Sequence, residues 1–501
     1  MSEEHAPAKP SVNRQAASGV AWSGGAQVAT QLITLGSRII QARLLSPGDF
    51  GLLGMATVVL AFIELLAGLG LGAAVVQAPE LDDQDRSTAF WAAVVQSLFL
   101  AALGVLVAPL VAGLFNEPRL VPVLRVLLAG SALIGPLAVV QAFFWRSLDF
   151  KTVATRQVTG DLLGNALGIA LAFAGAGVWS LVAGRLADSA IGLSLVWWKA
   201  RWRPNWTFSR ASLKKLAAFS AGTTAGGVFH AATRQLPAII IGRSLGSEAL
   251  GLFALTQQVV LMPLQYVARP ISRVLFPTFA RLQERPKELA RSYLKWQTAI
   301  VALGAMVLAI IAVVAPFAVP RFLGEKWAPA VPLFALLTIP ALGRLSLAVA
   351  ASSLRALGRL RLLGMWTTSA FVAQGLGLMV GLRSGLFGAV AGWAGGCLIS
   401  LLIGLVTSGH ALGIPTLRQL RPLRVVALPV LTLVAACWGV LHAAARWGLS
   451  TNPLVIVLAV LLGSVAYVGS FYLSARDDWD WIVGVVWRYL PPRWRPKKLE
   501  A

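Results

Sequence analysis

Charged side chains interrupt the long apolar stretches of this sequence, and their chemistry needs an explanation first. The cations are Arg38, Arg125, Arg185, Arg234, Arg269, Arg273 and Arg344, and the acids are Glu64, Asp161 and Asp188. At the centre of a membrane-spanning helix each costs roughly 2.5–3.5 kcal/mol on insertion scales, so such residues usually face a cavity or a partner. For Arg125, Arg273 and Arg344 the alternative is a side chain that snorkels to the membrane surface.

Arginine at these positions suggests a site for an anion. A guanidinium group stays protonated and binds phosphate through two parallel hydrogen bonds. If Arg38, Arg234 and Arg269 line one cavity, that cavity carries excess positive charge and suits a phosphate-bearing substrate. Arg185 is a further candidate for this cationic cavity, although Asp188 lies three residues later and a local ion pair would account for both.

Titratable side chains in the same segments are candidates for coupling transport to an ion gradient. Glu64 and Asp161 could bind a proton or sodium. His230 lies four residues before Arg234, on the same face of a helix, and titrates near neutral pH. A histidine on a face of small residues is more often a packed structural residue. The sequence predicts no catalytic residue, no metal site and no bound cofactor.

The elements that position these residues are transmembrane helices. Hydrophobic residues make up 57% of the 501, charged residues 13%, and the mean hydropathy is +0.74. Apolar stretches of about 20 residues recur without the alternation of a membrane β-barrel. We therefore predict an all-α polytopic membrane protein with about fourteen transmembrane helices.

Basic residues gather in the loops on one side of the predicted membrane. About 29 Lys and Arg fall in loops and tails on that side and about 7 in loops on the other, which predicts that both termini are cytoplasmic. The first residues, 1–17, are expected to form a retained cytoplasmic tail. Nucleic-acid binding is excluded in spite of the net charge of +23, because the basic residues do not share one solvated face.

A short internal repeat suggests two lobes. Arg43–Leu52 aligns with Arg243–Leu252 at an offset of 200 residues, and each copy is predicted to be the turn after the first helix of a six-helix lobe. Such parallel repeats predict a substrate site between the lobes, near mid-membrane. The predicted segments are the N-terminal tail (1–17), the N-terminal lobe (18–198), a basic cytoplasmic linker (199–215), the C-terminal lobe (216–410), two additional transmembrane helices (411–475) and an amphipathic basic cytoplasmic tail (476–501).

Motifs of enzymes are missing from the sequence. We find no Walker phosphate loop, no Gly-x-Ser-x-Gly elbow and no metal-binding His pair on a helix, so an enzyme is not predicted. Without an ATP-binding segment, energy for transport would come from an ion gradient or from the substrate's own concentration difference.

Four segments resemble bacterial polysaccharide flippases of the multidrug/oligosaccharidyl-lipid/polysaccharide exporter superfamily. They are Ala42–Leu52, Gly68–Gln77, Val274–Pro277 with Arg281–Gln283, and Leu323–Pro329. The last two are similar to the branch for lipopolysaccharide and exopolysaccharide biosynthesis. The resemblance implies a V-shaped, MATE-like pair of six-helix lobes with two extra helices, and a substrate that is an oligosaccharide linked to undecaprenyl diphosphate.

The expected function is therefore a flippase in the bacterial inner membrane that works by alternating access around the cationic cavity. The expected partners are membrane lipid and the lipid-linked oligosaccharide, with a polysaccharide polymerase or glycosyltransferases as further candidates. Three alternatives stay open: an ion-coupled multidrug exporter, a peptidoglycan-precursor flippase, and a non-transporting scaffold of a polysaccharide assembly complex.

Overall fold

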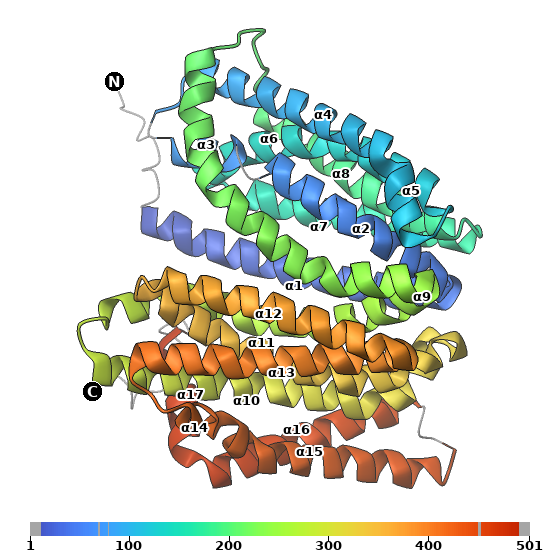
Figure 1. Cartoon of the computed structure of the whole chain (residues 1–501), viewed down its shortest axis with the longest axis vertical. Helices are drawn as coiled ribbons and strands as arrows, with labels where there is room; N and C mark the ends of the chain where they lie inside the picture. Colours follow the sequence, from blue (N-terminus) through green and yellow to red (C-terminus); the bar gives the residue numbers. More distant parts are fainter. Residues whose placement is uncertain (1–11, 69–70, 79, 449–451, 490–501) are drawn as a thin grey trace, which may run out of the picture. The chain divides into compact units, whose positions relative to one another are not determined.

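The computed structural model describes residues 12–68, 71–78, 80–448 and 452–489, and these ranges are almost entirely helical (Figure 1). They contain no β-strand, and nine segments within them are long and apolar enough to cross a membrane. One such segment, Leu360–Leu412, contains two helices. The prediction of an all-α polytopic membrane protein is confirmed. The first part of the N-terminal tail (1–11) and the end of the C-terminal tail (490–501) lie outside the described residues.

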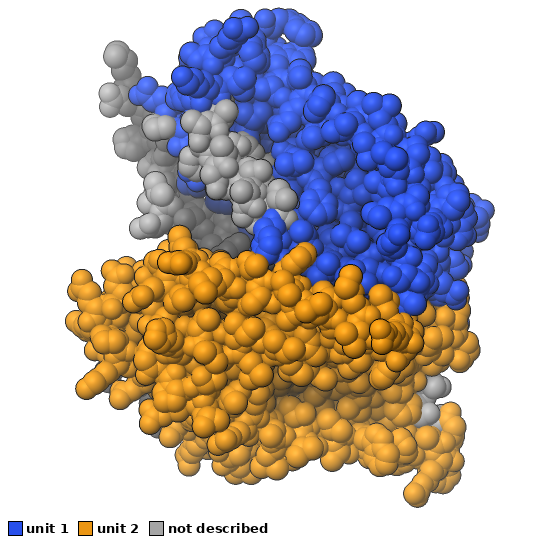
Figure 2. Space-filling model, in the orientation of Figure 1, with its two compact units in different colours: residues 1–251 blue, residues 252–501 orange. Residues whose placement is uncertain are grey.

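The chain divides into two compact units, residues 1–251 and 252–501, which Figure 2 colours separately. Unit 1 contains α1 (Val12–Leu44), α2 (Pro47–Gly68), α3 (Leu71–Gln77), α4 (Asp83–Phe115), α5 (Leu120–Gly130), α6 (Ile134–Arg146), α7 (Phe150–Phe173) and α8 (Val178–Ala200). The long helix α9 (Arg210–Arg281) begins in unit 1 and ends in unit 2. Unit 2 continues with α10 (Pro286–Ala318), α11 (Val331–Ala356), α12 (Leu360–Gly381), α13 (Gly385–Leu412), α14 (Thr416–Gln419), α15 (Arg421–Ala445), α16 (Pro453–Ser474) and α17 (Arg476–Tyr489).

The turn between α1 and α2 is built by a capping box. The Ser46 backbone N–H donates to Asp49 Oδ2 (2.9 Å), and the Asp49 N–H donates to Ser46 Oγ (3.2 Å). Pro47 occupies the first helical position, where its missing N–H costs nothing. The second copy of the predicted repeat also holds a turn, because α9 is interrupted at Gly246, with φ 82° and ψ −176°.

The two repeat turns pack directly against each other within unit 1. A Cβ atom added at Gly51 would lie 1.6 Å from the Ser247 carbonyl O, and one added at Gly251 would lie 1.8 Å from the Pro47 carbonyl O. The two contacts are related by the same 200-residue offset as the repeat itself. Glycine is therefore required at both positions, because any side chain would push the two backbones apart.

Helices α1, α7 and α8 hold the polar interior of unit 1. Helix α7 packs on both α1 and α8. The α7–α8 contact is close, since a Cβ atom at Gly164 would lie 2.6 Å from the Gly184 carbonyl O and one at Gly160 would lie 2.4 Å from Asp188 Oδ1. These three helices are not among the nine apolar segments, because polar and charged side chains lower their hydropathy.

The predicted amphipathic helix of the C-terminal tail is α17, and it packs against α10 and α16 in unit 2. Asp478 is 5% exposed and accepts a hydrogen bond from Arg421 Nη2 (2.8 Å). Trp481 contacts Trp296 edge to face, with 5.1 Å between ring centroids. The described part of this helix is thus held by the protein itself, through an ion pair with the buried Asp478 and aromatic packing.

Candidate functional site

Helix α1 presents a row of polar side chains to its neighbours. Thr30, Thr34, Arg38 and Gln41 follow one another at intervals of three or four residues, so they share one face of the helix. Gln41 is 3% exposed and Thr30 is 9% exposed. An apolar helix face would be expected at these positions if α1 only packed against lipid or a dry core, so the row marks a polar site.

Three residues of the row line a cavity of about 150 Å³ inside unit 1. Its lining comes from four helices: Thr34, Arg38 and Gln41 of α1, Leu53 of α2, Asp161, Gly164 and Asn165 of α7, and Leu181, Gly184, Arg185 and Asp188 of α8. Three residues predicted from the sequence as site residues, Arg38, Asp161 and Arg185, are therefore brought together. Two arginines and two aspartates line the cavity, so their formal charges cancel.

Arg185 has an acidic partner that its sequence position does not suggest. Its Nη2 donates to Glu64 Oε1 of α2, and both side chains are about two-fifths exposed, at 39% and 40%. The expected local pair of Arg185 with Asp188 is absent from the ion pairs of the described residues. Asp188 instead points at α7, where its Oδ1 lies against Gly160. The absence of a side chain at Gly160 makes room for the carboxylate in the close α7–α8 contact.

Several buried polar atoms around the cavity have no hydrogen-bond partner within the protein. They are Gln31 Nε2, Arg38 Nε, Gln41 Oε1 and Arg156 Nε. Arg38 also lies over the Phe50 ring, 5.8 Å from its centroid. Asn165 Nδ2 donates to the Asp161 carbonyl O (2.7 Å), which leaves its Oδ1 as a further acceptor. Buried polar groups are nearly always paired, so this concentration in one place points to a functional site.

The remaining predicted site residues lie on α9. Arg234 is exposed. The side chains of His230 and Arg269 lie outside the described residues, as does that of Arg273. Of the arginines for which snorkelling was the alternative, Arg125 and Arg344 are exposed.

Sequence reasoning missed the neutral polar residues of the cavity and one cation beside it. Thr34, Gln41 and Asn165 line the cavity, and Arg156 of α7 lies against α8, since a Cβ atom at Gly192 would come within 2.5 Å of its Nε. The spacing of polar residues along α1, and the four-residue spacing of Asp161 and Asn165, were available signals.

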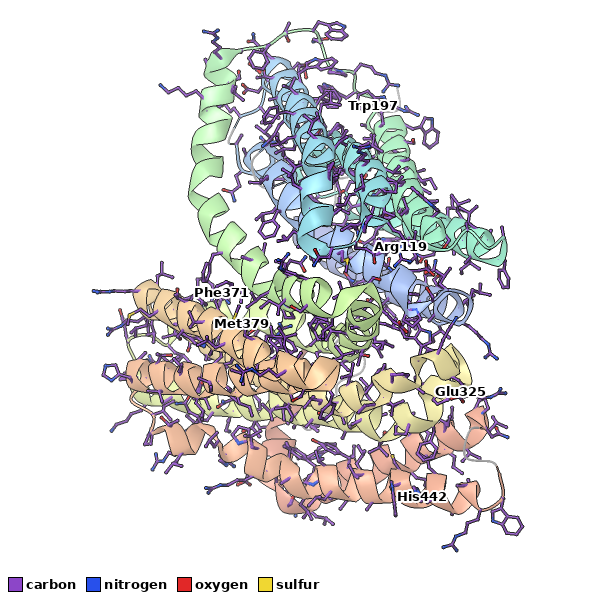
Figure 3. All side chains as sticks on the ribbon, turned by 45° about the vertical axis from the view of Figure 1, so that its right-hand side comes forward. Arg119, Trp197, Glu325, Phe371, Met379 and His442 are labelled. Atoms are coloured by element: carbon purple, nitrogen blue, oxygen red, sulfur yellow. The ribbon has the colours of Figure 1, made fainter. Side chains whose placement is uncertain are left out.

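A second polar cluster lies between α4 and α5 and holds the turn at Gly246. Ser247 Oγ donates to Glu117 Oε2 (3.0 Å), and Arg119 Nε donates to Glu117 Oε1 (2.8 Å). Arg119 is labelled in Figure 3. The hydrogen bond from Arg119 lowers the pKa of the Glu117 carboxyl group below its usual value. The cluster connects the start of α5 to the second repeat turn.

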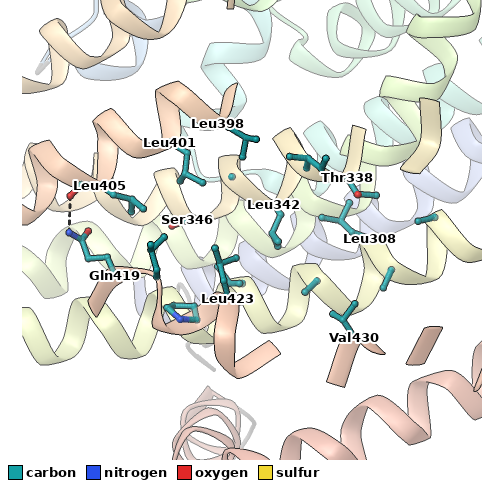
Figure 4. Close-up of a pocket in the computed structure, with 18 of the residues that line it drawn as sticks. Leu308, Thr338, Leu342, Ser346, Leu398, Leu401, Leu405, Gln419, Leu423 and Val430 are labelled. Atoms are coloured by element: carbon teal, nitrogen blue, oxygen red, sulfur yellow. Dashed lines mark hydrogen bonds between the residues drawn. The ribbon is translucent and has the colours of Figure 1, made fainter. Parts of the chain in front are cut away.

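Unit 2 contains an apolar pocket of about 410 Å³ between α10, α11, α13 and α15 (Figure 4). Leucine side chains such as Leu308, Leu342 and Leu401 dominate its lining. At one end Gln419 Nε2 donates to the Leu405 carbonyl O (2.7 Å), as the dashed line in Figure 4 shows. None of the predicted site residues lines this pocket.

The fold is that of known transporters. The structure of the lipid II flippase MurJ matches 91% of this chain and 99% of its own, with a TM-score of 0.72 and 12% identity. An inward-facing multidrug resistance MATE family transporter matches 77% of this chain and 94% of its own, with a TM-score of 0.62 and 17% identity. The MATE transporter belongs to the superfamily that the sequence resembles. The chain is thus a polytopic helical protein with the fold of these transporters and a charged interior in unit 1.

The sequence places the chain in a particular family. The family model described as polysaccharide biosynthesis protein matches residues 40–332, so the chain belongs to that family. Among similar proteins, the succinoglycan biosynthesis transport protein ExoT of Rhizobium meliloti is 29% identical over 66% of this chain and 67% of its own. The teichuronic acid biosynthesis protein TuaB of Bacillus subtilis is 26% identical over 75% of this chain and 78% of its own. The lipopolysaccharide biosynthesis protein WzxC of Escherichia coli is 26% identical over 67% of this chain and 68% of its own.

Proposed function

We propose that this protein moves undecaprenyl-diphosphate-linked oligosaccharide repeat units across the bacterial inner membrane for lipopolysaccharide or exopolysaccharide synthesis. The observation that carries the proposal is membership of the polysaccharide biosynthesis family on a chain with a transporter fold. Relatives named for succinoglycan transport and for lipopolysaccharide biosynthesis support the same substrate class.

We assign headgroup binding to arginines of α1 and α9. Arg38 and Arg234 are the leading candidates, and Arg269 is a further one. A guanidinium group binds a diphosphate through paired, charge-assisted hydrogen bonds. Arg38 supports this role because its buried Nε has no partner within the protein.

The described cavity is too small to hold the whole substrate. Its volume of about 150 Å³ is below the roughly 300–1,000 Å³ of ordinary ligand pockets. We therefore propose that it houses a charge network, with Arg185 paired to Glu64, and that Arg38 reaches the diphosphate in a conformation in which α1 and α7 separate.

Ion coupling is assigned to acids of the same network. Asp161 faces the cavity beside Arg38 and can take up a proton or sodium while Arg38 balances its charge in the absence of either. Glu64 and His230 are further candidates for coupling. Both termini are proposed to be cytoplasmic, and a polymerase and glycosyltransferases are proposed neighbours in the membrane.

A genetic experiment tests the proposed function. We expect that deletion of the gene abolishes the surface polymer and that lipid-linked repeat units accumulate on the cytoplasmic face of the membrane. Expression of the wild-type chain should restore the polymer. Loss of polymer with no accumulation of lipid-linked repeat units would contradict the proposal, because a block before their synthesis gives that result.

A further inference from the structure

The segment between α8 and α9 is fastened to the start of α4. Trp91 Nε1 donates to the Asn205 carbonyl O, and the Asn205 N–H donates to Ser87 Oγ, both at 3.0 Å. The Ser209 N–H donates to Thr88 Oγ1 (3.1 Å). Ser87 and Thr88 have no exposed surface. The segment has no regular secondary structure over most of its length, yet these contacts give it a fixed position on unit 1.

Aromatic packing reinforces this position and leaves indole rings exposed. Trp206 stacks on Trp91, with 4.3 Å between centroids and 21° between ring planes. Trp202 contacts Phe143 edge to face at 5.0 Å. Trp206 is nevertheless 87% exposed, and Trp198, at the end of α8, is 73% exposed. Trp197, labelled in Figure 3, lies under Arg203, whose Cζ is 5.5 Å from its ring centroid.

Exposed cations surround these rings. They are Lys199, Arg201, Arg203, Arg210 and Lys214. Among the described residues none of the five is in an ion pair, whereas the neighbouring Lys215 and Arg86 are paired with Asp85 and Asp83. The nearby acids therefore offset other cations, and the surface keeps its positive charge.

We propose that this surface, formed by Trp198, Lys199, Arg201, Arg203, Trp206 and Arg210 and called the linker surface, binds the headgroups of anionic phospholipids. It follows the end of α8, a helix of 23 residues, which is long enough to reach from one interfacial layer of a bilayer to the other. Exposed tryptophans favour that interfacial layer. Each Lys or Arg near an anionic membrane surface adds to the attraction. The inference does not depend on the transported substrate, because it concerns lipid that stays in the membrane.

An acidic protein is a less suitable partner than lipid. The linker surface exposes indoles that are apolar on one side and carry a polar N–H, which suits a layer that is partly hydrocarbon and partly wet. Attraction to phosphate would also hold an isoprenyl-diphosphate substrate, so the experiment compares the two lipids.

Lipid titration of the purified full-length chain in neutral detergent tests the proposal. The readout is the thermal unfolding midpoint as short-chain phosphatidylglycerol or phosphatidylcholine is added. We expect stabilisation by phosphatidylglycerol at lower concentration than by phosphatidylcholine. The triple variant R201Q/R203Q/R210Q should weaken the apparent affinity for phosphatidylglycerol about tenfold or more, from the loss of three attractive charges. The single variant Arg201→Gln should show a smaller loss.

A matched control removes three exposed cations elsewhere. The triple variant R355Q/R359Q/R361Q changes the turn between α11 and α12 and should keep the wild-type affinity within about twofold. Equal stabilisation of the wild type by both lipids would overturn the proposal, as would equal losses in the two triple variants. Unchanged phosphatidylglycerol affinity in R201Q/R203Q/R210Q, with weaker binding of an isoprenyl diphosphate, would identify the surface as a substrate entrance and would also overturn it.

Discussion

Arg38 combines features that a purely structural arginine would not need. It lies in the middle of a polar row on α1, shares a cavity with Asp161 and Asp188, and has a buried Nε without a partner. An arginine that only balanced the two carboxylates would be expected to hydrogen-bond them fully. The incomplete pairing is consistent with a residue that exchanges partners during transport.

Replacing Arg38 tests this role. We expect that Arg38→Ala abolishes polymer export while the protein stays in the membrane at wild-type level, because the diphosphate then loses the guanidinium donor of α1. Arg38→Lys should retain only part of the activity, since an ammonium group cannot bind phosphate bidentately. Arg125→Ala, which removes an exposed arginine of α5, is the matched control and should export normally. Normal export by Arg38→Ala would refute headgroup binding at this position.

The pair formed by Arg185 and Glu64 makes a second prediction at this scale. Removing one partner leaves an unbalanced charge, which costs about 3–5 kcal/mol when fully buried. Because both side chains are about 40% exposed, we expect a loss nearer roughly 1 kcal/mol. Arg185→Gln should therefore reduce the thermal unfolding midpoint and export. The double variant E64Q/R185Q should recover part of both, and a double variant worse than either single change would show that the two residues contribute independently and not as a pair.

At the scale of elements, the contact between the two repeat turns holds the start of α2 against the part of α9 that follows Gly246. The offset of 200 residues that links Arg43–Leu52 to Arg243–Leu252 reappears in space, where Gly51 faces Ser247 and Gly251 faces Pro47. This reciprocal contact supports the sequence repeat, because it gives a physical reason for the glycine that both copies carry at the same position, Gly51 and Gly251.

Adding a methyl group at either glycine tests the contact. Overpacking typically costs about 1–3 kcal/mol, and a backbone carbonyl at under 2 Å cannot move aside cheaply. We expect Gly51→Ala and Gly251→Ala each to lower the unfolding midpoint and export. Gly48→Ala is the control in the same helical turn, because its nearest contact would be an ordinary 3.7 Å from Ser46 Oγ. Equal stability of all three variants would contradict the close approach.

The cluster of Glu117, Arg119 and Ser247 gives a prediction about pH. The pKa of Glu117 is lower in the folded protein than in the unfolded chain, mainly because Arg119 donates a hydrogen bond to it. Its contribution to stability is therefore present above the unfolded value of about 4.3 and is lost as pH falls toward the folded value. Thermal unfolding should show Glu117→Gln less stable than wild type at pH 7, by less than about 1 kcal/mol, because Arg119 is largely exposed. The difference should shrink below pH 4, and a constant difference would exclude this origin.

At the scale of the whole molecule, the fold class followed from composition and periodicity because long apolar stretches have few structural options in a bilayer. The repeat turn at Gly246 was also predictable, since its partner copy carries strong turn residues at Ser46–Asp49. Family membership followed from the short motifs near Arg43 and Val274 and is confirmed by the match over residues 40–332.

The partners of individual charges were not predictable from the sequence. Arg185 was expected to pair with Asp188 on its own helix. The packing of α2 on α8 instead brings it together with Glu64, which lies 121 positions away in the sequence. Gln41 and Asn165 were missed because a neutral amide in a span carries a weak signal on its own, and only the packing of α1 on α7 shows that they share a cavity. Which charges meet depends on helix packing that sequence spacing does not encode.

Transport by the purified protein in liposomes is the most direct test of the central claim. An undecaprenyl-diphosphate-linked repeat unit of the native polymer would be placed in the outer leaflet of the liposomes. A membrane-impermeant sugar-binding protein, added outside, would report how fast the lipid leaves that leaflet. We expect liposomes with the wild-type chain to move the lipid at least about tenfold faster than liposomes with Arg38→Ala or without protein. Equal rates in the three preparations, with correctly inserted protein, would contradict the assignment as a flippase.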